Sequence, residues 1–191
     1  MTDRQQEILD KSIVLISEKG IQGFTVKNLS KAVGISEPAI YRHFHSKNEI
    51  LETILQHFEE MSDMFSLLTE NDSMGSFEKI AYMFDNMVNL FLDNPAIISI
   101  IFSEEIFKND PYLKSIIVRI MNKNETTIET IIASGQEKGE IRKDIEPGSL
   151  ALIVMGALRL MVKRWDLNDR NFDLKNEGAK LINSLKKVLT I

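Results

Sequence analysis

Apolar residues recur every three or four positions along nearly the whole of this 191-residue chain. This spacing places them on one face of an α-helix, and a chain that keeps it throughout buries helices against helices. The longest such stripe runs through Ile50, Ile54, Phe58, Met61, Phe65 and Leu68. We find no stretch that alternates apolar and polar residues between turn dipeptides, as strands do. The sequence therefore predicts an all-α fold.

Start and stop signals divide the chain into helices. Gly20 and Gly34 are typical of helix ends, and Asn94-Pro95 and Asp110-Pro111 each place a capping residue before a proline. Ser46-Lys47-Asn48-Glu49 has the pattern of a capping box, and Asp173 is a candidate cap. The predicted helices are 3–20, 26–33, 37–44, 47–69, 76–92, 95–107, 111–138, 147–166 and 173–190.

Composition excludes several classes of protein. Apolar residues make up 43% and charged residues 27%, as in ordinary globular chains, and there is no cysteine for a disulfide, a thiolate metal site or a nucleophile. The longest apolar run, 150–162, is too short to span a membrane and contains an arginine. The N-terminus is polar, unlike a signal peptide. We therefore expect a cytoplasmic protein without a membrane partner.

Charge is unevenly divided along the chain. The net charge is −5, which argues against nucleic-acid binding over the whole surface, but residues 1–50 hold seven basic and six acidic residues. His43 and His45, in the same segment, can add positive charge near an anion. This balance permits a local surface that contacts phosphates without establishing one.

Residues 25–45 carry the pattern of a helix-turn-helix. A short helix is followed by the turn Gly34-Ile35-Ser36 and a second short helix. Gly34 suits the turn because glycine adopts positive φ without strain, and the Ser36 side chain can cap the second helix. Ile40 and Phe44 are spaced to point into a helical core. The residues left to face a major groove are Glu37, Ala39, Tyr41, Arg42 and His43.

At these residues the chain resembles the TetR-like (TetR/AcrR) transcriptional regulators. The matching stretches are Phe24–Leu29, Ala32–Phe44 and Ser46–Leu51, and the match as a whole covers about 45 N-terminal residues; the rest is similar in architecture only. The resemblance implies a helix-turn-helix DNA-binding domain at 1–47 and a helical ligand-binding and dimerisation domain at 48–191. It implies a homodimer that binds double-stranded palindromic operator DNA, usually as a repressor, until a small molecule binds. It implies no cofactor.

The resemblance also implies roles for single residues. Thr25 and Lys47 match phosphate contacts at the starts of two helices, Tyr41 and His43 match recognition contacts, and Ser36, Glu37 and Ala39 occupy positions that vary with operator sequence. With two nearby cations, the predicted DNA-binding set is Thr25, Lys27, Ser36, Glu37, Ala39, Tyr41, Arg42, His43 and Lys47. Glu37 departs from an anion-binding pattern, because a carboxylate is unfavourable near phosphates. It must either accept from cytosine N4 or turn away. Ser30 replaces a commoner alanine.

Two other functions compete with DNA binding as interpretations of the sequence. An enzyme is disfavoured by the inventory: three histidines within 43–57, no nucleophile–base spacing, and a carboxylate pair, Glu104-Glu105, whose members point about 100° apart on a helix. His43 and His45 make a poor metal site, so no metal is expected. A helical module that binds another protein through its apolar C-terminal helices stays open as an alternative.

The segment 150–162 is apolar around its whole circumference, so it must be covered on all sides. The last helix carries an apolar stripe of its own. Together with the helix that contains 150–162, it suggests a four-helix interface between two chains of a dimer, although burial within one chain is an alternative. The predicted interface residues are Leu150, Val154, Ala157, Met161, Gly178, Leu181 and Leu185.

Phe and Met residues between 77 and 131 suit an apolar cavity, although such stripes are more often plain core. The predicted pocket residues for an unidentified effector, hypothesised to be fatty or aromatic, are Phe84, Met87, Phe102, Met121 and Arg159. Arg159 could instead pair with an acidic side chain at the dimer edge.

Overall fold

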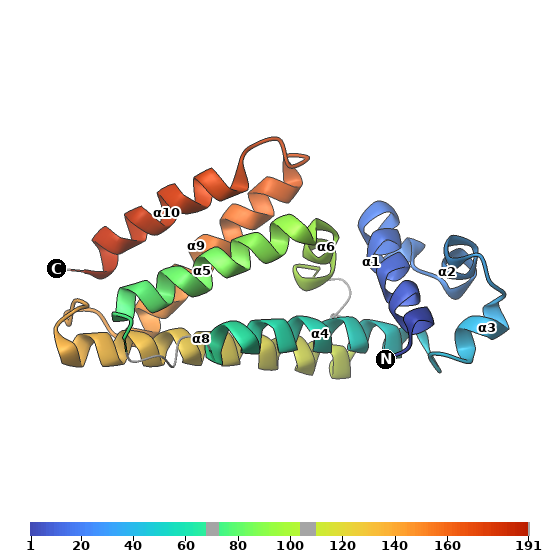
Figure 1. Cartoon of the computed structure of the whole chain (residues 1–191), viewed down its shortest axis with the longest axis horizontal. Coiled ribbons are helices and arrows are strands. Elements are labelled where there is room, and N and C mark those ends of the chain that lie inside the picture. The colour runs from blue at the N-terminus through green and yellow to red at the C-terminus, as the bar shows by residue number, and fades with distance from the viewer. Residues whose placement is uncertain (68–72, 104–109, 191) are drawn as a thin grey trace. The chain divides into compact units, whose positions relative to one another are not determined.

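The structure, a computed structural model, describes residues 1–67, 73–103 and 110–190, although the side chains of residues 65 and 66 are not described. Its secondary structure is helical, as predicted (Figure 1). The elements are α1 (Asp3–Gly23), α2 (Val26–Val33), α3 (Glu37–Tyr41), α4 (Lys47–Leu67), α5 (Ser76–Asp93), the 3-10 helix η2 (Pro95–Ile97), α6 (Ile98–Ile101), α8 (Pro111–Lys138), α9 (Pro147–Leu167) and α10 (Leu174–Leu189).

Several predicted helix boundaries are confirmed by their caps. Asp110 Oδ1 accepts hydrogen bonds from the amides of Tyr112 (3.0 Å) and Leu113 (2.9 Å), and Asp173 Oδ1 accepts one from Asn176 (3.0 Å). Gly20 has a φ of 66°, which bends α1 where the sequence predicted its end, but helical turns continue to Gly23. The predicted helix 95–107 is instead η2 and α6 as far as residue 101. Residues 104–107 of this prediction, with Glu104 and Glu105, lie outside the described residues, as does the end of the predicted helix 47–69.

The contacts divide the chain into two compact units. Unit 1 comprises residues 1–60 and 94–118, and unit 2 comprises residues 61–93 and 119–191. This division differs from the predicted domain boundary after residue 47, because η2, α6 and the start of α8 pack with the N-terminal helices. The predicted domain boundary itself stays a prediction.

In unit 1, α1 packs against α2, and α2 against α3 (Figure 1). The core of the three helices is built from fully buried aliphatic and aromatic side chains: Ile8, Leu9, Ile16, Phe24, Leu29 and Ile40. Ser30 is also buried, and its Oγ donates to the Lys27 carbonyl (2.9 Å), which satisfies the hydroxyl where the helices meet. This packing orients α2 and α3 as one rigid motif.

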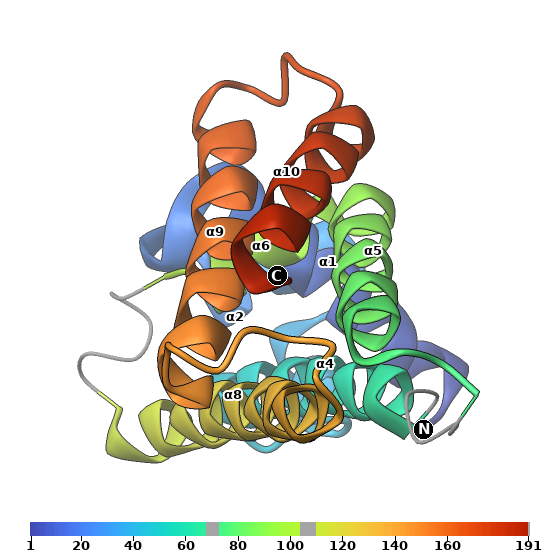
Figure 2. The same ribbon diagram turned by 90° about the vertical axis from the view of Figure 1, so that its left-hand side faces the viewer.

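In unit 2, α5, α9 and α10 lie side by side (Figure 2). Gly178 of α10 lies close to both neighbouring helices, since a Cβ there would be 3.3 Å from Val88 of α5 and 3.7 Å from Met161 of α9. The sequence predicted a close approach at Gly178. The structure shows that the neighbours making it belong to the same chain.

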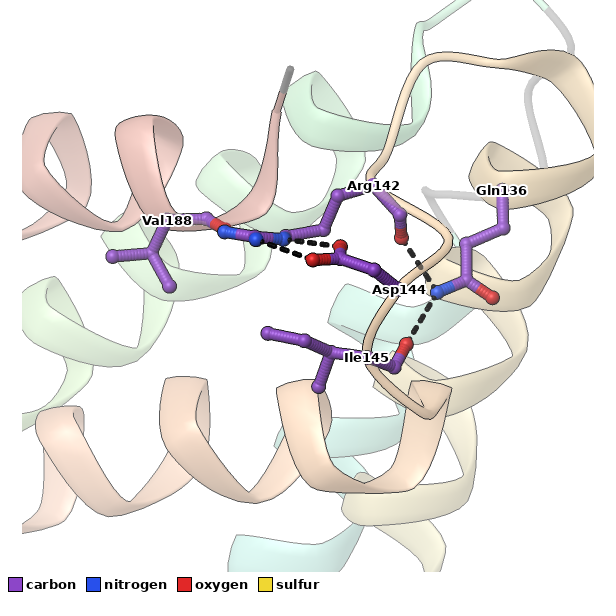
Figure 3. A network of polar contacts seen from close by, with 5 residues as sticks. All are labelled: Gln136, Arg142, Asp144, Ile145 and Val188. Atoms are coloured by element: carbon purple, nitrogen blue, oxygen red, sulfur yellow. Dashed lines mark hydrogen bonds and ion pairs between the residues drawn. The ribbon is translucent and has the colours of Figure 1, made fainter.

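A polar network holds the loop between α8 and α9 (Figure 3). The Gln136 side chain donates to the carbonyls of Arg142 (2.7 Å) and Ile145 (2.8 Å), and Arg142 pairs with Asp144 through two 2.7 Å contacts. The Arg142 amide and guanidinium also donate to the carbonyls of Leu189 and Val188. The pair raises the pKa of Arg142 and lowers that of Asp144. The loop is thereby fastened to the end of α10.

Among the described residues, no helix is long and apolar enough to cross a membrane.

Candidate nucleic-acid interface

The turn between α2 and α3 has the geometry that the sequence predicts. Gly34 lies in the left-handed region (φ 79°, ψ 28°), where glycine avoids the strain of a Cβ atom, and the space around it is open. The amides of Gly34 and Ile35 both donate to the Ser30 carbonyl, at 2.9 and 3.0 Å. These bonds close the end of α2 and set the direction in which α3 begins.

The predicted cap on α3 does not form: Ser36 occupies the N-cap position without a side-chain cap bond. An N-cap side chain accepts from the second or third amide of its helix. The second residue here is Pro38, which has no N–H, and the third amide, of Ala39, donates instead to the Ser36 carbonyl (2.9 Å). Ser36 therefore lies exposed at the start of α3.

The two sides of α3 differ as predicted. Ile40 and Phe44 are buried, whereas Glu37 and Arg42 are exposed and Tyr41 is 48% exposed. The regular helix ends at Tyr41 rather than at the predicted Phe44, although the Phe44 amide still bonds to the Ile40 carbonyl (3.0 Å). An exposed tyrosine and arginine on a short helix can reach a DNA groove without disturbing the core.

The start of α4 lies next to this motif. Ser46 Oγ accepts from the Glu49 amide (3.1 Å), as the capping box predicts, but Glu49 Oε2 accepts from the amide of His45 instead of that of Ser46. Lys47 Nζ lies 5.8 Å from the centroid of the Phe24 ring. The capped first turn and the ring together position the Lys47 ammonium.

One positioning residue was missed by the sequence analysis. Gln5 Nε2 donates to the His43 carbonyl (3.3 Å), which joins α1 to the chain just after α3. Gln5 also completes a capping box with Thr2 at the start of α1. The Thr-x-x-Gln pattern before an apolar run is the signal that could have identified it.

The remaining predicted DNA contacts lie on the same motif. Thr25 caps α2, its Oγ1 accepting from the Asn28 amide (3.1 Å), and Lys27 is exposed beside it; Ala39 and His43 are half-buried. Within the described part of the chain, Lys27, Arg42 and Lys47 have no ion-pair partner. We call the set Thr25, Lys27, Ser36, Glu37, Ala39, Tyr41, Arg42, His43 and Lys47 the recognition surface. Its three unpaired cations can attract phosphates.

The predicted effector-pocket residues differ in their environments. Phe84 is buried and Met87 half-buried on α5, while Met121 and Arg159 are exposed, all four in unit 2. Phe102 is half-buried in unit 1. Their assignment to one pocket stays a prediction. In the described ranges, no cluster of three or more histidine, aspartate or glutamate residues is arranged to hold a metal ion.

The predicted dimer residues lie mostly in the core of their own chain. Ala157 and Leu181 are half-buried, and the other five are buried in unit 2: Leu150, Val154, Met161, Gly178 and Leu185. Their assignment to a dimer interface stays a prediction. The apolar residues that α9 exposes are different ones: Leu152, Ile153, Leu160 and Leu167.

Two family profiles match consecutive parts of the chain. "Bacterial regulatory proteins, tetR family" matches residues 8–54, and "YsiA-like protein, C-terminal region" matches residues 58–187. The first covers the helix-turn-helix, and the second covers more than half of the chain.

Named relatives agree with these profiles. The nucleoid occlusion factor SlmA of Actinobacillus pleuropneumoniae is 29% identical over 68% of this chain, and the chain spans only 65% of that relative's length. The fatty acid metabolism regulator protein of Bacillus subtilis is 23% identical over 97% of this chain and 93% of its own.

Solved structures share the fold. The regulator FadR of Bacillus subtilis, in complex with stearoyl-CoA, superimposes with a TM-score of 0.77 at 22% identity, over 94% of this chain and 96% of its own. AibR, in complex with isovaleryl coenzyme A and operator DNA, gives 0.79 at 16% identity, with 98% of each chain covered. At such identities the likeness establishes the fold alone.

Proposed function

This chain belongs to the tetR family of bacterial regulatory proteins, and on that premise we propose that it is a homodimeric repressor that leaves a palindromic operator when a small molecule binds. The family consists of regulators and not of enzymes, in agreement with the absence of a nucleophile–base pattern in the sequence.

The recognition surface is the observation that carries the proposal. It combines an exposed Tyr41 on α3 with Lys27, Arg42 and Lys47, three cations that have no ion-pair partner among the residues that the structure describes. Side chains of the recognition helix read base edges, while flanking cations bind phosphates and fix the register. A surface of this kind matches duplex DNA better than a protein partner.

The dimer of this proposal uses the exposed face of α9. Leu152 and Leu160, each 63% exposed, flank Gly156 and Ile153 on one side of the helix. Such a contiguous apolar face is unusual on a chain that stays monomeric. Pairing it with a second copy covers it and supplies two recognition helices for two half-sites, which lie about 34–36 Å apart.

For the effector we propose an acyl-coenzyme A. Two relatives of this fold, FadR and AibR, are complexed with acyl-coenzyme A molecules in their solved structures. The Phe- and Met-rich helices of unit 2 offer the apolar surroundings that an acyl chain requires.

In this proposal α4 and α8 transmit the effector signal. Both helices run through the two units, and polar contacts join them in each: Tyr112 Oη to Glu52 (2.6 Å) in unit 1, and Lys123 to Asp63 (2.6 Å) in unit 2. An effector that favours one placement of these helices changes the separation of the recognition helices by a population shift. Equal Tyr41–Tyr41 separations in operator-bound and effector-bound crystals would contradict this.

A fluorescence-anisotropy titration tests the proposal. The full chain is titrated against DNA from upstream of its own gene and against scrambled DNA, at two salt concentrations, with and without acyl-coenzyme A molecules of different chain length. We expect tight binding to the upstream DNA alone and its release by one class of acyl chain. Equal weak binding to both DNAs would instead favour a module that binds another protein.

A further inference from the structure

Glu37 is the one acidic residue on the recognition surface. Its side chain is exposed at the first position of α3, and among the described residues it has neither a hydrogen bond nor an ion pair. The cations of the surface are equally unpaired, so none of them neutralises it. A solvated glutamate is ordinary elsewhere, but here it sits where the bound ligand is a polyanion.

The position of Glu37 places it close to bases. The N-terminal residues of a recognition helix approach base edges, and Glu37 lies one turn before Tyr41 on the same side of α3. Next to a phosphate the carboxylate would be repelled. A favourable contact therefore requires a hydrogen-bond donor on a base.

The chemistry of the major groove narrows the choice to one base. A carboxylate is ionised at neutral pH and can only accept hydrogen bonds. Thymine O4 and guanine O6 and N7 are acceptors and repel it, and adenine places the N7 acceptor beside its N6 donor. Cytosine presents its N4 amino group without an adjacent acceptor of its own.

We infer that Glu37 is a specificity-determining residue that accepts a hydrogen bond from the N4 amino group of one cytosine in each operator half-site. This inference rests on the proposed function. It assigns a base to a residue of this chain and goes beyond operator binding as such.

Selection from a random DNA pool by the full-length dimer tests it. The wild-type chain is compared with Glu37→Gln, Glu37→Ala and the control Glu18→Gln, which removes from α1 one exposed carboxylate that has no partner among the described residues. We expect the wild type and the control to select cytosine at one position of each half-site. Glu37→Gln should select adenine there, because an amide pairs with adenine N6 and N7. Glu37→Ala should lose the preference at that position only.

Affinity for a modified operator gives a second measurement. Replacing the selected cytosine by a 2-pyrimidinone nucleotide removes only the N4 amino group, and should weaken wild-type binding about tenfold while leaving Glu37→Ala unchanged. If both Glu37 variants still select the cytosine, or if removal of its amino group does not change binding, the inference is overturned and the proposed function is not. If the wild-type chain selects no sequence from the pool, the proposed function itself is overturned.

Discussion

Lys47 Nζ lies 5.8 Å from the centroid of the Phe24 ring, so the first residue of α4 is held over the residue that precedes the cap of α2. A cation within about 6 Å of a ring face is attracted by it. The contact keeps the ammonium beside the helix-turn-helix, and Phe24 itself is fully buried. The ring thereby gives the Lys47 ammonium a defined position.

Removing the Lys47 charge should weaken DNA binding without changing its sequence preference. We expect Lys47→Gln to lower affinity for operator and scrambled DNA alike and to reduce the slope of log K against log salt by about 1, since one phosphate contact is lost. Lys47→Arg should preserve both values. An unchanged salt slope in Lys47→Gln, measured by anisotropy, would show that this side chain does not contact a phosphate.

Substitutions at Tyr41 and Phe44 should have different effects, the first on DNA binding and the second on the stability of the fold. Tyr41→Ala removes an exposed ring, so we expect loss of operator binding with unfolding free energy changed by less than about 0.5 kcal/mol. Phe44→Ala removes a buried ring and should cost about 3–5 kcal/mol. Urea unfolding followed by circular dichroism measures both. Comparable destabilisation by the two variants would mean that Tyr41 belongs to the core.

Gly34→Ala should destabilise unit 1 through backbone strain alone. The position has a φ of 79° and open space where a Cβ would point, so the expected cost of about 1 kcal/mol comes from the left-handed conformation. Gly34→Asn should cost less, because asparagine tolerates this region better. If both variants unfold at the wild-type urea concentration, the turn does not require glycine.

Leu160→Glu should convert the dimer into a monomer. A charge placed in an apolar interface loses its hydration without gaining a partner, whereas the same residue on a free surface is harmless. Light scattering coupled to size-exclusion chromatography gives the mass. The control is Val14→Glu, which changes an exposed apolar residue of α1 and should stay dimeric. A dimeric Leu160→Glu would place the interface elsewhere.

Glu140 should make stability depend on pH. Its carboxylate accepts from the Ser76 amide (2.7 Å), and this bond, with that of the Ser76 hydroxyl, lowers the pKa of Glu140. Because the pKa is lower in the folded chain, the contact stabilises the fold above the unfolded value of about 4.3, and this stabilisation is lost as pH falls through the folded value.

Thermal unfolding at several pH values checks this. Glu140→Gln should melt below the wild type at pH 7, and the difference should vanish once the pH falls below the lowered pKa of Glu140. Glu137→Gln, at an exposed carboxylate on α8 that has no partner within the described ranges, should match the wild type throughout. A difference that persists at low pH would mean that side-chain packing, and not ionisation, is responsible.

The sequence by itself determined the features that depend on near neighbours. The αL turn at Gly34, the caps at Asp110 and Asp173 and the burial of Ile40 and Phe44 were all predicted, because their hydrogen bonds and helical spacing span five residues or fewer. The Ser36 hydroxyl, which makes no cap hydrogen bond, shows the limit of such patterns. Its cap was predicted from residue type, but Pro38 and the Ala39 amide leave it no donor.

Only the tertiary structure decided which side of α9 is covered. Leu150 and Val154 are buried and Leu152 and Leu160 are exposed, yet all four belong to a segment that is apolar on every side. A helix without a polar face has no periodic signal to orient it. Its orientation follows instead from close packing against α5 and α10, around Gly178, through contacts between residues far apart in the chain.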